Sequence, residues 1–209
     1  MRRIEYFYSA HSAFAYLGSA RLMKICRDNN CVLEHRPIDL RPVIHGVGGL
    51  PVNGRTRAHV DYFFGREIER WAEWRGVDII SHRPTHHDNP LDLPNGMLIA
   101  AARQSSDVDG LAHAFLQAHW RDDADLADAQ TLAALAKSIG IDDAPLLEAA
   151  LSAPVQRRHQ ANTLEAIERS VFGSPTYVLD GDMFYGQDHL EMLERALQKP
   201  FATPQFTNP

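Results

Sequence analysis

The sequence predicts an α/β protein in which a small sheet domain is interrupted by a block of helices. Three observations carry this prediction. The chain opens with a strand, a helix and a second strand, and its long middle part has helical apolar spacing without a strand. Strand-forming residues then return near residue 176, and a last helix follows them. The order βαβ, helices, ββα indicates that the first and last parts share one sheet and that the helices are inserted in it.

The opening segment predicts two parallel strands joined by one helix. Residues 3–8, RIEYFY, and residues 31–39, CVLEHRPID, combine apolar and β-prone side chains. Between them, residues 13–27 carry apolar side chains near helical spacing, at Phe14, Leu17, Leu22 and Ile25. A helix between two strands of one sheet predicts a right-handed crossover and parallel pairing.

The middle of the chain predicts helices only. Residues 57–75 form one amphipathic stretch that Gly76 ends. Its apolar side chains recur at steps of four, four and three, at Val60, Phe64, Ile68 and Trp71. Further helices are expected to begin near Pro94, Gly110, Asp128, Asp142 and Pro154.

The last part predicts a hairpin followed by a helix. Residues 176–179 and 183–185 are β-prone and are joined by Asp180-Gly181, a strong hairpin signal. A helix is expected over residues 187–198. The predicted division is a discontinuous sheet domain at 1–45 and 166–200, an inserted helical domain at 46–165 and a flexible tail at 201–209.

This order of elements is the thioredoxin-type arrangement. In that fold the reactive group lies at the N-terminus of the first helix and faces a proline before the third strand, which are Ser12 and Pro175 here. The unpaired N–H groups and the dipole of a helix N-terminus stabilise an anion. Serine is also a favoured helix N-cap, so the position alone leaves both interpretations of Ser12 open.

Three blocks extend the comparison to nearly the whole chain. They are FYSAHSAFAYL at 7–17, VDYFFGREIERWAEWRGV at 60–77 and AIERSVFGSPTYVLDGDMFYGQDHLEMLE at 166–194. In this order they resemble the 2-hydroxychromene-2-carboxylate isomerases, relatives of the kappa-class glutathione transferases and of DsbA-like proteins. The resemblance implies a thioredoxin-like fold, glutathione as cofactor and a homodimer.

The resemblance also implies roles for individual residues. Ser12 resembles the serine that hydrogen-bonds the sulfur of bound glutathione. Ser174 and Pro175 resemble the cis-proline step whose backbone pairs with the tripeptide. The remaining matches are Asp188 for the glutathione amino group, Gln187 for the same end, and Asn53 in a loop lining the tripeptide and substrate sites.

Some positions depart from the family pattern. Ser9 stands where the family has an aspartate, Ala13 where it has a proline, and His189 where it has an arginine. The change at Ala13 is mild, because proline there only preorganises a helix start. His11 is either a proton shuttle beside the sulfur or a partly exposed histidine of the turn.

The activity implied by the resemblance is cis–trans isomerisation of a bicyclic hemiketal to an open-chain hydroxybenzylidenepyruvate, in the breakdown of aromatic compounds. A serine, unlike a cysteine, forms no disulfide with glutathione and only favours its thiolate, which is the better nucleophile. The substrate carboxylate needs cationic or donor groups, for which the loops of the insert offer Arg55, Arg57, Arg83 and His86.

Two other functions remain open at this level. A kappa-type glutathione transferase would use the same thiolate but release a conjugate. A non-catalytic thioredoxin-fold protein would hold a peptide or partner at the cis-proline edge. A metal site in the loop SHRPTHHDNP, with His82, His86, His87 and Asp88, is not expected, because helical i, i+4 ligand spacing is missing there.

Composition favours a small molecule as the partner, and the resemblance implies that this is an aromatic carboxylate. The 209 residues carry a formal net charge of -6 and no dense basic run, which argues against nucleic acid. No apolar run is long enough for a bilayer, and the N-terminus has no signal-peptide pattern. A cytoplasmic location is expected. Cys26 and Cys31 lack the C-x-x-C spacing of a redox pair and are interpreted as packing thiols.

Overall fold

The structure, a computed structural model, describes residues 1–50, 52–104, 106–205 and 207. Its centre is a four-stranded sheet in the order β2-β1-β3-β4. The strands are β1 (Arg2–Tyr8), β2 (Cys31–Pro37), β3 (Thr176–Leu179) and β4 (Asp182–Tyr185). β1 and β2 are parallel, and β3 pairs antiparallel with both β1 and β4. The predicted α/β fold with inserted helices is confirmed.

Helices follow each part of the sheet. α1 (Ala13–Asp28) connects β1 to β2, and the short helix η3 (Gln187–His189) leads into α10 (Leu190–Gln198) after β4. Between β2 and β3 the chain forms α2 (Leu40–Gly46), η1 (Val52–Gly54), α3 (Arg57–Asp61), η2 (Tyr62–Arg66), α4 (Glu67–Arg75), α5 (Asp92–Arg103), α6 (Val108–Arg121), α7 (Ala129–Ser138), α8 (Ala144–Ala150) and α9 (Ala153–Glu168). The domain boundaries themselves stay a prediction.

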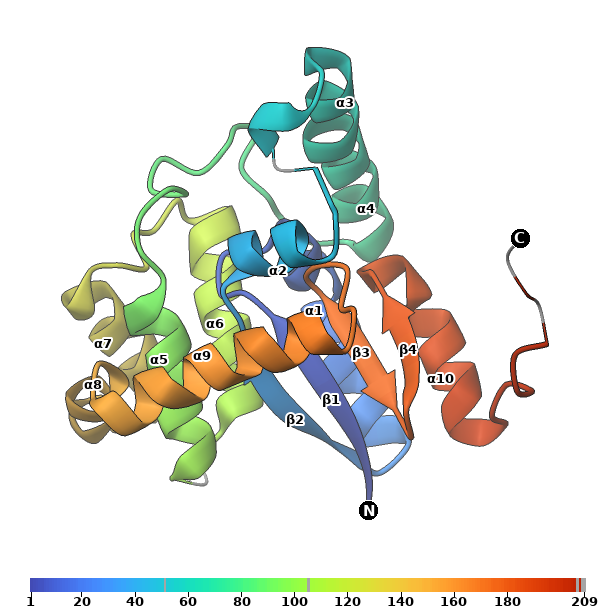
Figure 1. Cartoon of the computed structure of the whole chain (residues 1–209). Helices are drawn as coiled ribbons and strands as arrows, with labels where there is room; N and C mark the ends of the chain where they lie inside the picture. Colours follow the sequence, from blue (N-terminus) through green and yellow to red (C-terminus); the bar gives the residue numbers. More distant parts are fainter. Residues whose placement is uncertain (51, 105, 206, 208–209) are drawn as a thin grey trace.

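The sheet is covered on both faces (Figure 1), and the alternation of β1 explains how. Tyr6 and Tyr8 point to the face covered by α1 and α10, where they join the larger hydrophobic core. Phe7 points to the other face and packs in a second cluster with residues of α2 and α9. Successive strand residues face opposite sides, so one strand serves two cores.

The hairpin and the long first helix of the insert form largely as expected. Asp180 and Gly181 have φ values of 52° and 89°, the left-handed conformations that a two-residue hairpin turn requires. The stretch 57–75 is helical, and Gly76 ends it with φ 65°. A single π-helical segment, η2, lies inside this stretch, which apolar spacing alone does not reveal.

Two further features complete the fold. α2 was not expected from the sequence; its N-terminus is capped by Asp39, whose carboxylate accepts from the Arg41 N–H at 3.2 Å. Within the described ranges, no helix has the length and apolar character needed to cross a bilayer.

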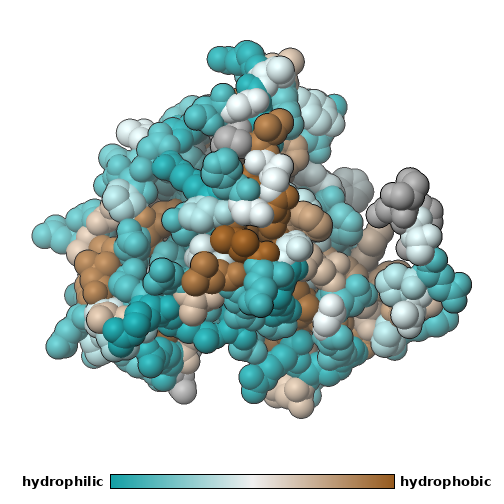
Figure 2. Space-filling model, viewed as in Figure 1, coloured by the Kyte–Doolittle hydropathy of each residue, from teal (hydrophilic) through white to brown (hydrophobic). Residues whose placement is uncertain are grey.

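Figure 2 shows a mostly hydrophilic face with apolar surface near its middle. The exposed apolar side chains of the protein include Leu164 on α9 and Phe172.

A glycine lets the last part of the chain pack directly on α1. A Cβ on Gly18 would lie 2.7 Å from Gln187 Cβ, 3.1 Å from Leu190 and 3.3 Å from the Tyr177 hydroxyl. Distances this short leave no room for a methyl group. Gly18 therefore sets the depth at which η3 and α10 dock against the first helix.

We predict that Gly18→Ala lowers the free energy of unfolding by about 1–3 kcal/mol, because η3 must move away from α1. The matched control is Gly65→Ala, since Gly65 is helical and a Cβ added there would meet no atom within 4 Å. That change should leave stability unchanged or raise it by up to about 1 kcal/mol. Urea unfolding followed by circular dichroism measures both variants. Equal stability of Gly18→Ala and the wild type would contradict the packing argument.

Candidate functional site

The end of β1 and the start of β3 bring Ser12 against the Ser174–Pro175 peptide bond, which is cis. Ser12 is the N-cap of α1, and its Oγ accepts from the Ala15 N–H at 3.3 Å. The same hydroxyl donates to the Ser174 carbonyl oxygen at 3.1 Å. Only 6% of Ser12 is exposed. Both interpretations of Ser12 are compatible with this geometry, because a cap hydroxyl can also donate to an anion.

Ser9 connects the parts of this turn. Its N–H donates to Ser174 Oγ at 3.1 Å, and its carbonyl oxygen accepts from the Ser12 N–H at 3.0 Å. Its own hydroxyl lies 2.9 Å from His11 Nδ1. Ser9 is fully buried. Ser9 has a hydroxyl where the resembled family has an aspartate, so this position offers no carboxylate. Ser9 also links His11 to Ser174, because it is hydrogen-bonded to both.

His11 lies in a histidine cluster, which we define as His11, His87 and His119. The His11 and His87 ring centroids are 4.5 Å apart, and His87 Nδ1 lies 3.0 Å from His119 Nε2. His119 Nδ1 lies 3.1 Å from the Ala124 carbonyl oxygen, which can only accept. His119 therefore donates from Nδ1 and accepts at Nε2, and His87 donates from Nδ1.

The histidine cluster is held neutral. Burial lowers the pKa of His11 well below its usual range, and the neighbouring His87 and His119 lower it further. Burial, together with His119, lowers the pKa of His87 to about 3. Burial also lowers the pKa of His119. Arg41 and Arg83, both paired with Asp88, add positive potential near His11 and oppose its protonation.

Side chains of the inserted helices form hydrogen bonds with the backbone of this turn and fix its position. Trp120 Nε1 on α6 donates to the His11 carbonyl oxygen at 2.8 Å. Asn95 Oδ1 on α5 accepts from the Ala10 N–H at 3.2 Å, and Asn95 Nδ2 donates to the Ile38 carbonyl oxygen at 3.2 Å. Asn95 is fully buried, so its amide joins the ends of β1 and β2 through the insert.

An aromatic wall stands beside the start of α1. Phe14 lies against Phe63 with ring centroids 5.0 Å apart, and Phe63 is in edge contact with Phe64. The Arg55 guanidinium lies 5.6 Å from the Phe63 ring and 5.3 Å from the Phe64 ring. The candidates for the substrate carboxylate were Arg55, Arg57, Arg83 and His86. Of these, Arg55 is joined to the first turn of α1 through the contacts of Phe63 and Phe64 with Phe14.

The loop before α10 presents an acidic side chain. Asp188 is exposed and lies in η3, directly after Gly186, whose φ is 96°. A positive φ of this size is strained for any residue with a Cβ, so glycine is required there. The Gly186 N–H donates to the Pro175 carbonyl oxygen at 2.9 Å. Asp188 is therefore held on the segment that packs beside the cis-proline.

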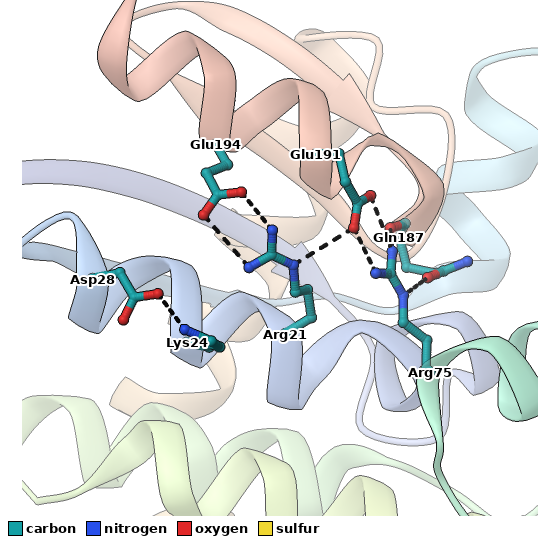
Figure 3. A network of polar contacts seen from close by, with 7 residues as sticks. All are labelled: Arg21, Lys24, Asp28, Arg75, Gln187, Glu191 and Glu194. Carbon is teal, nitrogen blue, oxygen red and sulfur yellow. Dashed lines mark hydrogen bonds and ion pairs between the residues drawn. The ribbon is translucent and has the colours of Figure 1, made fainter.

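Gln187, by contrast, is 1% exposed and belongs to a polar network (Figure 3). Its Oε1 accepts from Arg75 Nε at 3.0 Å, and its carbonyl oxygen accepts from Arg75 Nη2 at 2.9 Å. Arg75 also pairs with Glu191 at 2.6 Å, and Arg21 pairs with Glu194 on α10. The side chain expected to touch a ligand thus has a structural role between α4 and η3, and contact with glutathione stays a prediction.

The other candidates are dispersed. Asn53 is exposed in η1, and Arg57 pairs with Asp61 on α3. His82 lies 3.6 Å from Asp123, and His86 lies 3.6 Å from Asp125. Among the residues that the structure describes, no group of three or more His, Cys, Asp or Glu side chains is arranged to hold a metal ion.

Comparison with known proteins identifies the family of this chain. Residues 3–198 match the DSBA-like thioredoxin domain. The chain belongs to the DsbA-like thioredoxin family. A 2-hydroxychromene-2-carboxylate isomerase from Sphingobium xenophagum is 25% identical over 203 residues, covering 94% of this chain and 98% of that protein. One from Pseudomonas putida is 28% identical over 196 residues, covering 93% of each.

A solved structure of a selenomethionine 2-hydroxychromene-2-carboxylate isomerase is 26% identical to the chain. Its TM-score is 0.77, and the match covers 94% of this chain and 95% of that one. The resemblance carried by the three sequence blocks is confirmed.

In this DsbA-like chain neither cysteine lies at the start of α1. Cys26 lies near the end of α1 and Cys31 begins β2, and both are buried and free. Burial raises the pKa of each thiol above its usual value. The interpretation as packing thiols agrees with these surroundings.

Sequence reasoning missed the partners of His11. His119 follows Leu111 and Phe115 at steps of four on the buried face of α6, and a histidine on such a face needs a polar partner. That pattern was a usable signal. His87 offered none, because only the tertiary fold brings its loop to β1.

We predict that acid destabilises the protein through these buried rings. The unfolded chain takes up protons near pH 6.5 while native His87, with a pKa of about 3, does not, so stability present above pH 6.5 is lost as pH falls toward 3. Between pH 7.5 and 5.5 this loss is about 1.4 kcal/mol for His87. His87→Gln should reduce the loss by about that amount in urea unfolding.

The control for this measurement is His45→Gln, an exposed position on α2. It should keep the pH dependence of the wild type. An unchanged pH dependence in His87→Gln would show that His87 takes up protons equally in the native and unfolded states, contrary to the neutral cluster.

Proposed function

We propose that this protein is a glutathione-dependent cis–trans isomerase of the 2-hydroxychromene-2-carboxylate type, acting on an aromatic carboxylate. The observation that carries the proposal is the Ser12 hydroxyl, at the N-terminus of α1 and 3.1 Å from the carbonyl oxygen that precedes cis-Pro175. The relatives named as 2-hydroxychromene-2-carboxylate isomerases, matched over 93% or more of this chain, support the reaction.

The residues present fit glutathione. A sulfur anion suits the start of α1, where a hydroxyl donor and the helix dipole both favour negative charge. The glutathione amino group suits Asp188, which is exposed and lies on the segment bonded to the Pro175 carbonyl oxygen through Gly186. The peptide part suits the backbone of Ser174, beside the cis peptide bond.

Bound glutathione would supply a thiolate that adds reversibly to a conjugated double bond and so removes the barrier to its rotation. The part of Ser12 is to hold that thiolate. Its hydroxyl must then turn its proton from the Ser174 carbonyl oxygen to the sulfur, while Oγ still accepts from Ala15. The donor is already positioned, so little reorganisation accompanies the exchange.

The histidine cluster carries no charge that could pair with the thiolate. Its rings are neutral, and a lowered pKa means that none of them retains a second proton at neutral pH. His11 is hydrogen-bonded to Ser9, which shares Ser174 with Ser12. We therefore assign the thiolate's stabilisation to Ser12 and the α1 N-terminus, and to His11 the positioning of Ser9 in the turn that carries Ser12.

The aromatic wall supports an aromatic carboxylate as substrate. Phe14, Phe63 and Phe64 offer ring faces and edges next to the first turn of α1. Arg55 brings a guanidinium to the same surface, and guanidinium pairs with carboxylate through two parallel hydrogen bonds. A ring with a carboxylate side chain satisfies both features at once.

Ser12→Ala should lower kcat roughly a hundredfold, because it removes a donor to the developing charge. The assay follows the ultraviolet spectrum of the substrate with and without glutathione. The variant also loses a helix cap of about 1 kcal/mol, so the control is Asp128→Ala, which removes the cap of α7, a bond of 2.9 Å to Thr131 N. That control should keep full activity.

The same assay separates the alternatives. An isomerase leaves the glutathione concentration unchanged, whereas a transferase consumes it in step with product. Turnover that does not depend on glutathione would contradict the proposed mechanism. An unchanged turnover in Ser12→Ala would contradict it as well.

Arg55→Gln should raise KM for the carboxylate substrate about tenfold or more with a smaller change in kcat, because a charge-assisted pair is lost. The methyl ester of the same substrate is the control compound, and its KM should hardly respond to the change. Equal effects on the acid and the ester would show that Arg55 acts on the shape of the wall and not on the carboxylate.

A further inference from the structure

A second concave site lies at the outer edge of the sheet, apart from the site at Ser12. It is a cavity of about 660 Å³ between β2, the C-terminal end of α5, the start of α6 and the first turns of α9. None of the side chains assigned above to glutathione, to the histidine cluster or to the aromatic wall lines it. We call it the β2-edge cavity.

Unpaired arginines gather in the β2-edge cavity. Arg103, Arg157 and Arg158 line it. Across the described ranges, the arginines that form no ion pair are Arg27, Arg55, Arg103, Arg157, Arg158 and Arg195. Half of the arginines without a carboxylate partner therefore face one cavity. Because like charges repel, three unpaired arginines at one cavity favour the binding of an anion there.

The negative groups near the cavity are already neutralised. Glu34, which lines it, pairs with Arg36 at 2.6 Å and with Arg3 at 3.5 Å. Asp109 pairs with His35 at 2.7 Å. The first turn of α9 contains no acidic residue, so its N-terminal dipole adds positive potential.

A buried acceptor supplies an independent observation. Asn162 lines the cavity and is 1% exposed. Its Nδ2 donates to the Pro37 carbonyl oxygen at 3.1 Å, which fixes the orientation of the amide. Its Oδ1 is buried and has no hydrogen-bond partner among the described residues. An acceptor left in this state costs free energy until an O–H or N–H group meets it.

We propose that the β2-edge cavity binds a small organic polyanion that carries a hydroxyl or N–H donor beside its acidic groups. The arginines take the anionic groups, and Asn162 Oδ1 accepts from the donor. The volume falls within the range of small-molecule sites. A nucleic acid is disfavoured, because the chain has a net charge of -6 and the arginines line a bounded cavity.

The test compares two tricarboxylates by isothermal titration calorimetry at low salt. Citrate carries a hydroxyl and tricarballylate is the same acid without it. Citrate should bind about fivefold more tightly, since only citrate can satisfy Asn162 Oδ1. Inorganic phosphate, which has charge but little reach, should bind more weakly than either. No heat with citrate at millimolar concentration overturns the proposal, and so does equal affinity for the two tricarboxylates.

Arginine variants locate the binding. Arg103→Gln and Arg157→Gln change exposed side chains, so they leave the core intact, and each should weaken citrate about tenfold. Arg66→Gln, an exposed arginine paired with Glu69 outside the cavity, should leave the affinity unchanged. Equal loss in all three variants overturns the proposal.

The oligomeric state provides the last arm of the test. Light scattering on Arg157→Gln should match the wild type with and without citrate. A shift in mass without a change in citrate affinity would assign this face to a second copy of the chain and overturn the proposal. Isomerase activity is not a readout here, so a failure of the proposed function leaves this test intact.

Discussion

The pairing of β1 with β3 is the constraint on which the site depends. Its register sets Phe7 opposite Thr176, and the next residues of each strand continue toward Ser9 and Ser174 without a ladder bond. Side chains take over at that point: Ser9 N–H meets Ser174 Oγ, and Ser12 Oγ meets the Ser174 carbonyl oxygen. The N-terminus of α1 is thus joined to the cis-proline loop by the end of a sheet, a rigid support for an anion.

The electrostatics of this junction follow from burial. Neutral rings in the histidine cluster provide hydrogen bonds but no cation, and Asp88 offsets the nearby Arg41 and Arg83. Positive potential at Ser12 therefore comes from the backbone of α1 more than from any side chain. Such potential does not titrate near neutral pH, which would suit the sulfur anion of the proposed function.

Much of the fold could be predicted because its signals are local. Apolar periodicity gave the strands and long helices, and Asp180-Gly181 gave the hairpin turn. The short α2 escaped because its seven residues include one buried side chain, Val43, which sets up no period. Within the site, Ser12 could be found from a helix start. The link from His87 to His11 could not, since their contact depends on how the insert folds back on the sheet.

The two parts of the chain divide the chemistry between them. Under the proposed function, the sheet and α1 supply Ser12 and Ser174, which would hold the thiol. Under the same proposal, the insert supplies the groups that would distinguish one substrate from another, namely Arg55 with its aromatic neighbours. Contacts such as Trp120 to the His11 carbonyl oxygen fix the insert to the turn through backbone atoms. Side chains of the insert can therefore change without moving Ser12, and substrate choice can vary while the sulfur site stays constant.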